Sequence, residues 1–269
     1  MSNKTVACVI ARTVSTRLPL KVLRNVVDDY TMLDFMIQRL KFVNSIDEIY
    51  ICTSDEPVDE ILVDVANKNK VKVYRGSPDA VIERLIAVGE LETADNVIRI
   101  TGDNVFTSYE YLEDQIKIHN ENDLDYTRIM DVPIGSTAEV MRLTAVKKCY
   151  EQIDPAVSEY LLLYMFDPKQ FRCGVIRIND LKKSSDYTIT VDTPADLSRT
   201  KEIFTLNESS PLLIQLKNIV EIIDKHDISN SKYTLSGNVK MPYGKEIPFE
   251  EFQNNMEQRS EQSMNFSIG

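Results

Sequence analysis

The first residues with a chemical pattern form a basic run near the start of the chain. Arg12, Arg17, Lys21 and Arg24 follow one another without an intervening acid, although the chain has 42 acidic and 31 basic residues and a net charge of −11. Arginine and lysine hold phosphate oxygens by charge-assisted hydrogen bonds, and the hydroxyl of Ser15 adds a donor. The run therefore indicates a local site for a small polyphosphate, with a solvated basic loop as the alternative interpretation.

Composition narrows the function classes. A glycine-based phosphate cradle is excluded, because neither GxGxxG nor GxxxxGK[ST] occurs and the first glycine is Gly76, so side chains must hold the phosphates. The acidic balance argues against a nucleic-acid polymer as partner. No stretch reaches the roughly 18 apolar residues of a membrane span, which predicts a cytoplasmic protein. The four scattered cysteines lack metal-ligand spacing and are expected to be buried free thiols.

Two acidic residues each follow a β-type run. Asp103 comes after residues 96–101 and a glycine, and Asp192 follows residues 186–191 and precedes Pro194. Mg²⁺ typically takes one or two protein carboxylates and fills its other positions with water and phosphate oxygens. The alternative for each aspartate is a helix cap or a turn. Two carboxylates at strand ends beside a basic loop indicate metal-assisted chemistry on a polyphosphate.

The elements that must position these residues alternate between strands and helices. Residues 5–11, 48–53, 71–74 and 96–101 predict short buried strands, and apolar residues at helical spacing fill the segments between them. Ser54 or Asp55 is the expected cap of the helix near Val58. This alternation predicts an α/β fold of three layers with a mostly parallel sheet. Ligands then bind at the carboxyl ends of the strands, within residues 12–21, 53–57, 75–79 and 101–107.

The second half of the chain is less regular. Residues 125–130 and 137–143 predict strands around a turn at 133–136, and residues 186–191 predict one more strand before a helix near Pro194. We therefore expect a nucleotide-binding domain over residues 1–210 with a small irregular lobe at 125–175. Residues 211–269 add a helix at 212–223 and a polar tail, which from about residue 253 is expected to be disordered or bound to a partner.

Residues 10–23 read IARxxSxRLPxKxL and resemble the N-terminal signature of the CMP-sugar synthetase family of cytidylyltransferases. Further matches at 74–79, 97–103, 135–140 and 190–197 are most similar to the spore coat polysaccharide biosynthesis protein F group, collinearly over about residues 5–205. The resemblance implies a nucleotide-diphospho-sugar transferase-like domain. It also implies Mg²⁺-dependent transfer of CMP from CTP to an acidic sugar of the 3-deoxy-ulosonic acid type, with release of pyrophosphate for surface polysaccharide or glycan synthesis, by a homodimer.

The same resemblance implies residue roles. Arg12, Lys21 and Asp103 would be catalytic, and Asp103 and Asp192 would bind the metal. Nucleotide contacts would come from Ala11, Arg12, Ser15, Arg17, Lys21, Ser54, Arg75, Gly76, Ser77, Asp79, Thr101 and Asp103. Glu139 would lie near the acceptor. Arg128 and Tyr160, in the predicted irregular lobe, are further acceptor candidates, with a solvated surface arginine as the alternative for Arg128.

The sequence departs from the family pattern at three positions. Leu20 stands where the family has glycine, Val105 replaces the usual proline, and Tyr160 replaces a common histidine, so an acceptor other than a usual sugar acid is an open alternative. One alternative hypothesis is a CDP-forming enzyme that acts on a phosphorylated or phosphonate non-sugar acceptor. A GT-A-like glycosyltransferase is another, although Asp103-Asn104-Val105 lacks the expected Asp-x-Asp. A nucleotide-binding protein without catalysis would not need two metal carboxylates.

Overall fold

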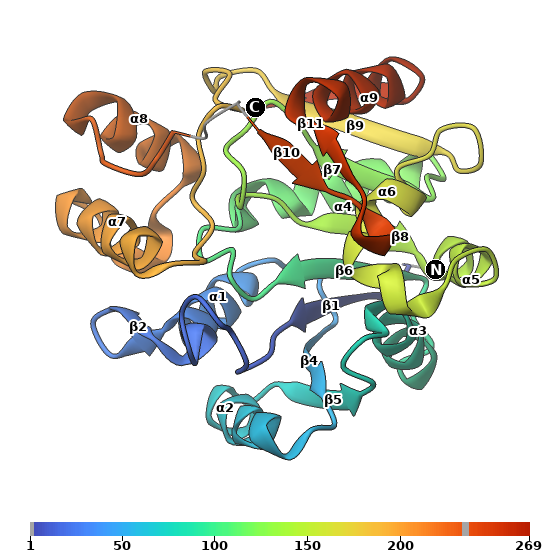
Figure 1. Ribbon diagram of the computed structural model, residues 1–269, viewed down its shortest axis with the longest axis horizontal. Helices are drawn as coiled ribbons and strands as arrows, with labels where there is room; N and C mark the ends of the chain where they lie inside the picture. The colour runs from blue at the N-terminus through green and yellow to red at the C-terminus, as the bar shows by residue number, and fades with distance from the viewer. Residues whose placement is uncertain (1–2, 233–236) are drawn as a thin grey trace.

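One sheet organises the chain, which a computed structural model describes for residues 3–232 and 237–269 (Figure 1). Its eight strands lie in the order β12-β9-β7-β8-β6-β1-β4-β5. Only β8 runs antiparallel to its neighbours among these strands, so the mostly parallel sheet is confirmed. The bounds are β1 (Thr5–Ile10), β4 (Glu48–Ser54), β5 (Lys72–Gly76), β6 (Asn96–Thr101), β7 (Tyr126–Ile129), β8 (Glu139–Arg142), β9 (Cys173–Ile178) and β12 (Met264–Ile268).

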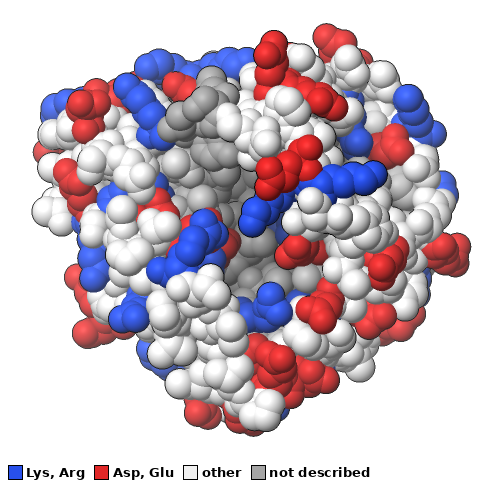
Figure 2. Space-filling view, in the orientation of Figure 1, with Lys and Arg blue, Asp and Glu red and all other residues white. Residues whose placement is uncertain are grey.

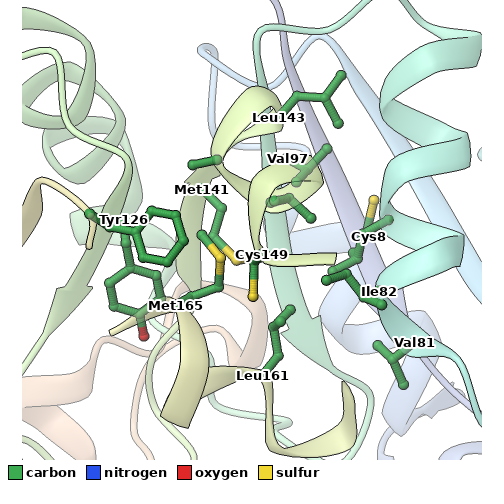
Figure 3. Close-up of a cluster of buried hydrophobic side chains, with 14 of the residues drawn as sticks. Cys8, Val81, Ile82, Val97, Tyr126, Met141, Leu143, Cys149, Leu161 and Met165 are labelled. Carbon is green, nitrogen blue, oxygen red and sulfur yellow. The ribbon is translucent and has the colours of Figure 1, made fainter. Parts of the chain in front are cut away.

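Helices cover both faces of this sheet, as the alternation of β1 requires. Cys8 points into an apolar cluster with α3 (Val81–Leu91), α5 (Leu143–Tyr150), α6 (Leu161–Met165) and Met256 of α9 (Phe249–Glu261) (Figure 3). Val9 points to the opposite face, which packs on α1 (Met32–Leu40), α2 (Ile61–Asn69) and α4 (Leu112–Glu121). Neighbouring residues of a strand face opposite sides, so a strand buried on both faces reads as a continuous apolar run. The three-layer α/β fold is confirmed.

A third apolar cluster packs against β7 and β9 and includes residues of α1, the helix that also covers Val9. It joins α1 to α7 (Pro194–Leu206) and α8 (Leu216–His226). The shorter elements are β2 (Asn25–Val27), β3 (Tyr30–Thr31), β10 (Asn238–Lys240) and β11 (Glu246–Pro248), and the 3-10 turns η1 (Lys21–Leu23), η2 (Pro57–Asp59), η3 (Tyr109–Tyr111), η4 (Pro155–Tyr160), η5 (Pro211–Leu213) and η6 (Pro242–Gly244). In the described part of the chain no helix combines the length and apolarity needed to cross a bilayer.

The C-terminal segment corrects one expectation. The predicted disordered tail from about residue 253 is wrong, because α9 buries Met256 and β12 pairs in parallel with β9, with Phe266 opposite Ile176. The strand supplies backbone hydrogen bonds to an otherwise unpaired sheet edge, which low apolar content does not reveal. The expected helix at 212–223 begins later, at Leu216, after η5.

Two further local expectations are wrong. Residues 186–191 do not form a strand but make isolated bridges, Ile134 to Thr188 and Tyr187 to Lys232. They pair with a turn instead of a strand edge, so a ladder cannot extend. Neither Ser54 nor Asp55 caps a helix, because Ser54 ends β4 and η2 begins after Glu56 without a side-chain cap. The four cysteines are buried and free, as expected.

Candidate functional site

A cleft of about 690 Å³ opens where β1 and β6 end, at the edge where ligands bind in parallel sheets. Figure 2 shows the viewed face hollowed near its centre, with Lys and Arg side chains around the hollow and Asp and Glu among them. Many of the residues predicted for the site line the cleft. These are Ala11, Arg12, Ser15, Arg17, Lys21, Asp79, Thr101, Asp103 and Asp192. Segments more than 170 residues apart in the sequence therefore meet at one surface.

Hydrogen bonds and apolar packing fix the basic loop after β1. Thr13 donates from its backbone nitrogen and its hydroxyl to Asp59 Oδ1, at 2.7 and 2.6 Å. Ser54 also bonds Asp59, and although burial favours protonation, these hydrogen bonds lower the pKa of the Asp59 carboxyl. Leu18 is buried in the third cluster. Leu20 has a left-handed backbone with φ of 55°, the conformation that suits the glycine of the family pattern.

The two carboxylates lie on either side of one lysine. Lys21 Nζ is 2.7 Å from Asp103 Oδ2 and 2.9 Å from Asp192 Oδ1, and Arg17 Nη2 is 3.0 Å from the same Asp192 oxygen. A backbone hydrogen bond of 3.0 Å from Val191 N to Asp103 O ties the two segments together. Burial alone would lower the pKa of Lys21, but the two carboxylates raise it, so the ammonium group stays charged.

Neither aspartate is used as a helix cap. The cap of α7 is Thr193, whose hydroxyl accepts a bond from Asp196 N, while Asp196 Oδ2 accepts from Thr193 N and from Asp192 N at 2.8 and 3.1 Å. At the end of β6 the turn is held by Asn104, which donates to the Thr101 hydroxyl at 2.7 Å. Asp103 and Asp192 therefore keep their side chains for the cleft, with about a quarter of each exposed.

The donor set fits a Mg²⁺ ion that shares its coordination with a phosphate ligand. Two carboxylates face one cleft, and in the described ranges no group of three or more His, Cys, Asp or Glu side chains could hold a metal alone. A site of one or two carboxylates completed by water and phosphate oxygens is the usual Mg²⁺ arrangement. The nearby cations Arg12 and Arg17 line the same cleft and suit the phosphates.

Four predicted nucleotide residues lie outside the lining of the cleft. Ser54 is buried and bonds Asp59, so it supports the loop. Arg75 turns to the loop after β4, where it donates to the carbonyl oxygens of Ser54, Asp55 and Glu56 and pairs with Glu60. Gly76 and Ser77 precede the lining residue Pro78. The predicted nucleotide roles of these four residues stay predictions.

The three acceptor candidates separate in space. Glu139 is buried between Arg99 Nη1 at 2.5 Å and the Tyr126 hydroxyl at 2.6 Å. Arg128 lies over the Phe166 ring, 5.5 Å from its centroid, and lines a second cavity of about 250 Å³. Tyr160 ends η4 and lines neither the cleft nor this cavity. Of the three, Arg128 alone faces a space that an acceptor can enter.

Several residues that line the cleft were not among the predicted site residues, namely Arg84, Arg99, Ala156 and Glu159. Pro78, which also lines it, lies within the predicted ligand-binding loop at 75–79. Arg84 lies in the helix that follows the match at 74–79, and Arg99 lies inside the match at 97–103. In a helix or strand a charged residue usually marks a solvated face. Arg84 is 1% exposed instead. The signal in the sequence was an arginine on the apolar side of a helix, next to Leu85 and Ile82.

Comparison with known proteins identifies the family. The family model described as cytidylyltransferase matches residues 6–219. The chain belongs to the cytidylyltransferase family. It is 30% identical over 201 residues to the spore coat polysaccharide biosynthesis protein SpsF of Bacillus subtilis, covering 72% of this chain and 83% of that protein. An uncharacterized protein of Methanocaldococcus jannaschii is 27% identical over 226 residues, or 83% of this chain and 91% of that protein.

Solved structures of cytidylyltransferases share the fold. A cytidylyltransferase from Leptospira borgpetersenii superposes with a TM-score of 0.76 at 23% identity, over 87% of this chain and 99% of that chain. The synthetase of CMP and 2-keto-3-deoxy-manno-octonic acid, solved with CTP, superposes with a TM-score of 0.59 at 18% identity, over 75% and 98%. The family match makes this chain a nucleotidyltransferase. The superpositions confirm the expected nucleotide-diphospho-sugar transferase-like fold.

Proposed function

We propose that this cytidylyltransferase transfers CMP from CTP to an acidic sugar of the 3-deoxy-ulosonic acid type, or to a related small anionic acceptor, and releases pyrophosphate. The observation that carries the proposal is the meeting of Lys21 with Asp103 and Asp192 in one cleft. The fold neighbour solved with CTP and the relative named for spore coat polysaccharide synthesis support the substrate class and a role in surface polysaccharide synthesis.

In this proposal the basic loop binds the triphosphate. Arg12, Arg17 and Lys21 neutralise phosphate oxygens, and Ser15 donates a hydrogen bond. The acceptor hydroxyl oxygen forms a bond to the α-phosphorus while the bond to the bridging oxygen of pyrophosphate breaks, and the hydroxyl proton passes to solvent. Charge grows on the leaving pyrophosphate, so fixed cations accelerate the step by electrostatics and positioning. The pKa of Lys21 lies above its ordinary value, which keeps this charge in place at neutral pH.

Asp103 and Asp192 would hold Mg²⁺ in the same scheme. When bound, this ion neutralises phosphate charge and orients the triphosphate. The carboxylates themselves are already oriented, because Asp196 fixes the backbone of Asp192 and the Val191 hydrogen bond fixes Asp103. Lys21 compensates part of their negative charge, so the pair can face one another at low cost.

The acidic group of the acceptor would bind Arg128. No carboxylate of the described residues pairs with this guanidinium, its Nε atom is buried without a hydrogen-bond partner, and it lines the second cavity. Gly135 lines that cavity too, and it packs on Thr190, two residues before Asp192. The wall of the second cavity is therefore in contact with the segment that leads to Asp192.

Pyrophosphate release tests the proposal. The protein is incubated with Mg²⁺, a panel of acidic sugars, sugar phosphates and phosphonates, and each of CTP, UTP, ATP and GTP in turn. The mass of the product is measured by mass spectrometry. The proposal expects CTP-dependent release and a conjugate with one phosphorus on an acidic sugar. A product with two phosphorus atoms on a phosphorylated acceptor, or with one phosphate and one phosphonate phosphorus, identifies the CDP-forming or phosphonate alternative. Transfer of a sugar without pyrophosphate contradicts both.

We further propose that the enzyme works in the cytoplasm as a homodimer with its active domain in residues 1–210. The four buried free thiols suit a reducing compartment. Sedimentation equilibrium reports the oligomeric state directly, and a monomer at micromolar concentration contradicts the dimer.

A further inference from the structure

One buried cation in the cleft is left without a carboxylate. Arg84, near the start of α3, is 1% exposed and lines the cleft. Its Nη1 donates to the Cys52 carbonyl oxygen at 3.1 Å, but Nε and Nη2 have no hydrogen-bond partner within residues 3–232 and 237–269. Arg17 and Lys21, in contrast, are paired with Asp192 or Asp103. Burial, with repulsion from Arg12, lowers the pKa of Arg84.

The other buried arginines, Arg39 and Arg199, also have an Nε atom without a partner among the described residues, but each has a carboxylate partner, which Arg84 lacks. Arg199 is 2.9 Å from Asp196, and Arg39 has Glu110 at 3.8 Å as well as the Ile214 carbonyl oxygen at 2.7 Å. Leaving buried donors unpaired costs free energy, and a buried charge without a partner costs more. Because Arg84 lines the cleft, a bound ligand can supply the hydrogen-bond acceptors that its buried donors lack.

Arg84 lies at a different strand from the carboxylates of the proposed phosphate site. Its Nη1 bonds β4, whereas Asp103 follows β6, and β1 lies between these two strands. Its aliphatic chain packs on Gly76, where a Cβ would come within 3.1 Å of Cγ. The cleft wall beside it includes Pro78 and Val81, which are apolar. A guanidinium next to an apolar wall, away from the carboxylates, suits a flat polar ring better than a triphosphate.

We propose that Arg84 reads the nucleobase, donating from Nε and Nη2 to O2 and N3 of cytosine. This inference rests on the proposed use of CTP. Cytosine offers two neighbouring acceptors on this edge, and a guanidinium presents two parallel donors, as in the arginine contact to O6 and N7 of guanine. Uracil has the same O2 but carries a hydrogen on N3, so one donor would face another. Arg84 thereby selects cytosine over uracil.

Access to these donors requires a small movement of the cleft wall. Because Arg84 is almost completely buried, the base reaches Nε and Nη2 only if the segment from Gly76 to Asp79 shifts outward. Arg12 holds this segment in the structure, since its Nη1 donates to the Pro78 carbonyl oxygen at 3.3 Å. When Arg12 turns to the phosphates it releases Pro78, so triphosphate binding and base recognition are coupled.

Calorimetric titration of CTP and UTP with Mg²⁺ tests the proposal on the full chain. We expect the wild type to bind CTP at least tenfold more tightly than UTP. Arg84→Met should weaken CTP binding by about tenfold to a hundredfold, the range for one bidentate base contact, and leave UTP binding nearly unchanged. Arg39→Met is the matched control, a buried arginine away from the cleft, and should keep the preference.

Three results of this titration would overturn the inference. Equal losses for CTP and UTP in Arg84→Met would place the guanidinium on a phosphate, an unchanged preference would make it structural, and a wild type without preference would remove the basis. If Arg84→Met does not fold, Arg84→Lys repeats the test, because it keeps the positive charge but lacks the two parallel donors of the guanidinium. A wild-type measurement needs no variant: 3-deaza-CTP, which lacks N3, should bind at least tenfold more weakly than CTP, and equal binding refutes the contact. Failure of the wild type to bind any CTP refutes the proposed function itself.

Discussion

Gly135 lies against Thr190, two residues before Asp192, and does not line the cleft, which makes Gly135→Ala an informative perturbation. The residue has φ of +93°, and a Cβ there would lie 2.6 Å from Thr190 N. Residue 134 bridges to Thr188, so the turn and the segment leading to Asp192 are in direct backbone contact. An added methyl group must therefore push the Asp192 segment away from the turn.

The size of the effect follows from this contact. A distance of 2.6 Å is about 0.8 Å short of the 3.4 Å at which ordinary contacts begin, so Asp192 should move by nearly 1 Å. A misplacement of this size in a catalytic site costs roughly a hundredfold in rate. The left-handed backbone adds about 1–2 kcal/mol of destabilisation when the residue gains a side chain. We expect kcat/KM for CTP to fall about a hundredfold and the Mg²⁺ requirement to rise.

The matched control is Gly244→Ala, which has φ of +70° but no atom within 4 Å of the new Cβ. It carries the same backbone cost without the contact, and it should lose about 1–2 kcal/mol of stability with less than a twofold change in kcat/KM. Steady-state rates at several Mg²⁺ concentrations and urea unfolding separate the two effects. A Gly135→Ala enzyme with wild-type rates and Mg²⁺ dependence would refute the claim that this contact positions Asp192.

Two further predictions concern charged or titratable groups. Asp103→Ala should lower turnover at saturating Mg²⁺ by at least a hundredfold. Its circular dichroism spectrum should be unchanged, because Lys21 keeps its contact with Asp192 at 2.9 Å. Glu90→Ala, which breaks a surface ion pair, is the control, and near wild-type turnover in Asp103→Ala would contradict the metal role. Burial lowers the pKa of His119 to about 3 from 6.5, so the unfolded state alone gains a proton as pH falls below 6.5 and stability declines towards pH 3. Between pH 7 and pH 5 this costs about 2 kcal/mol, and His119→Asn should remove that part of the loss in urea unfolding; equal pH dependence in both proteins would contradict it.

Much of the fold could be predicted because strands buried on both faces leave continuous apolar runs. Residues 96–101 were predicted as a strand and β6 has these bounds, while the predicted strand at 5–11 ends one residue earlier in β1. The strand β12 was missed although its residues alternate between apolar and polar, because it is short and pairs with β9, about 90 residues earlier, a contact that no local pattern encodes. The predicted strand at 186–191 failed because its β-branched residues meet a turn at Ile134 instead of a strand edge.

The site divides in the same way. Arg12, Lys21 and Asp103 belong to local motifs at strand ends, so topology alone predicts that they share one edge of the sheet. The ion pair between Lys21 and Asp192 depends on how the chain between them folds. The sequence predicts that both residues lie at the same edge of the sheet, but it does not predict this contact. Arg84 was missed because an arginine in a helix is usually exposed to solvent, although its place on the apolar side of α3 was a signal of burial.

The most direct test of the account is a crystal structure of the protein with CTP and Mg²⁺. We expect the triphosphate to lie against Arg12, Ser15, Arg17 and Lys21, with Mg²⁺ bound by Asp103 and Asp192 and the α-phosphorus facing the second cavity. CTP bound elsewhere, or a metal ion held by other side chains while these two aspartates stay paired with Lys21, would contradict the central claim.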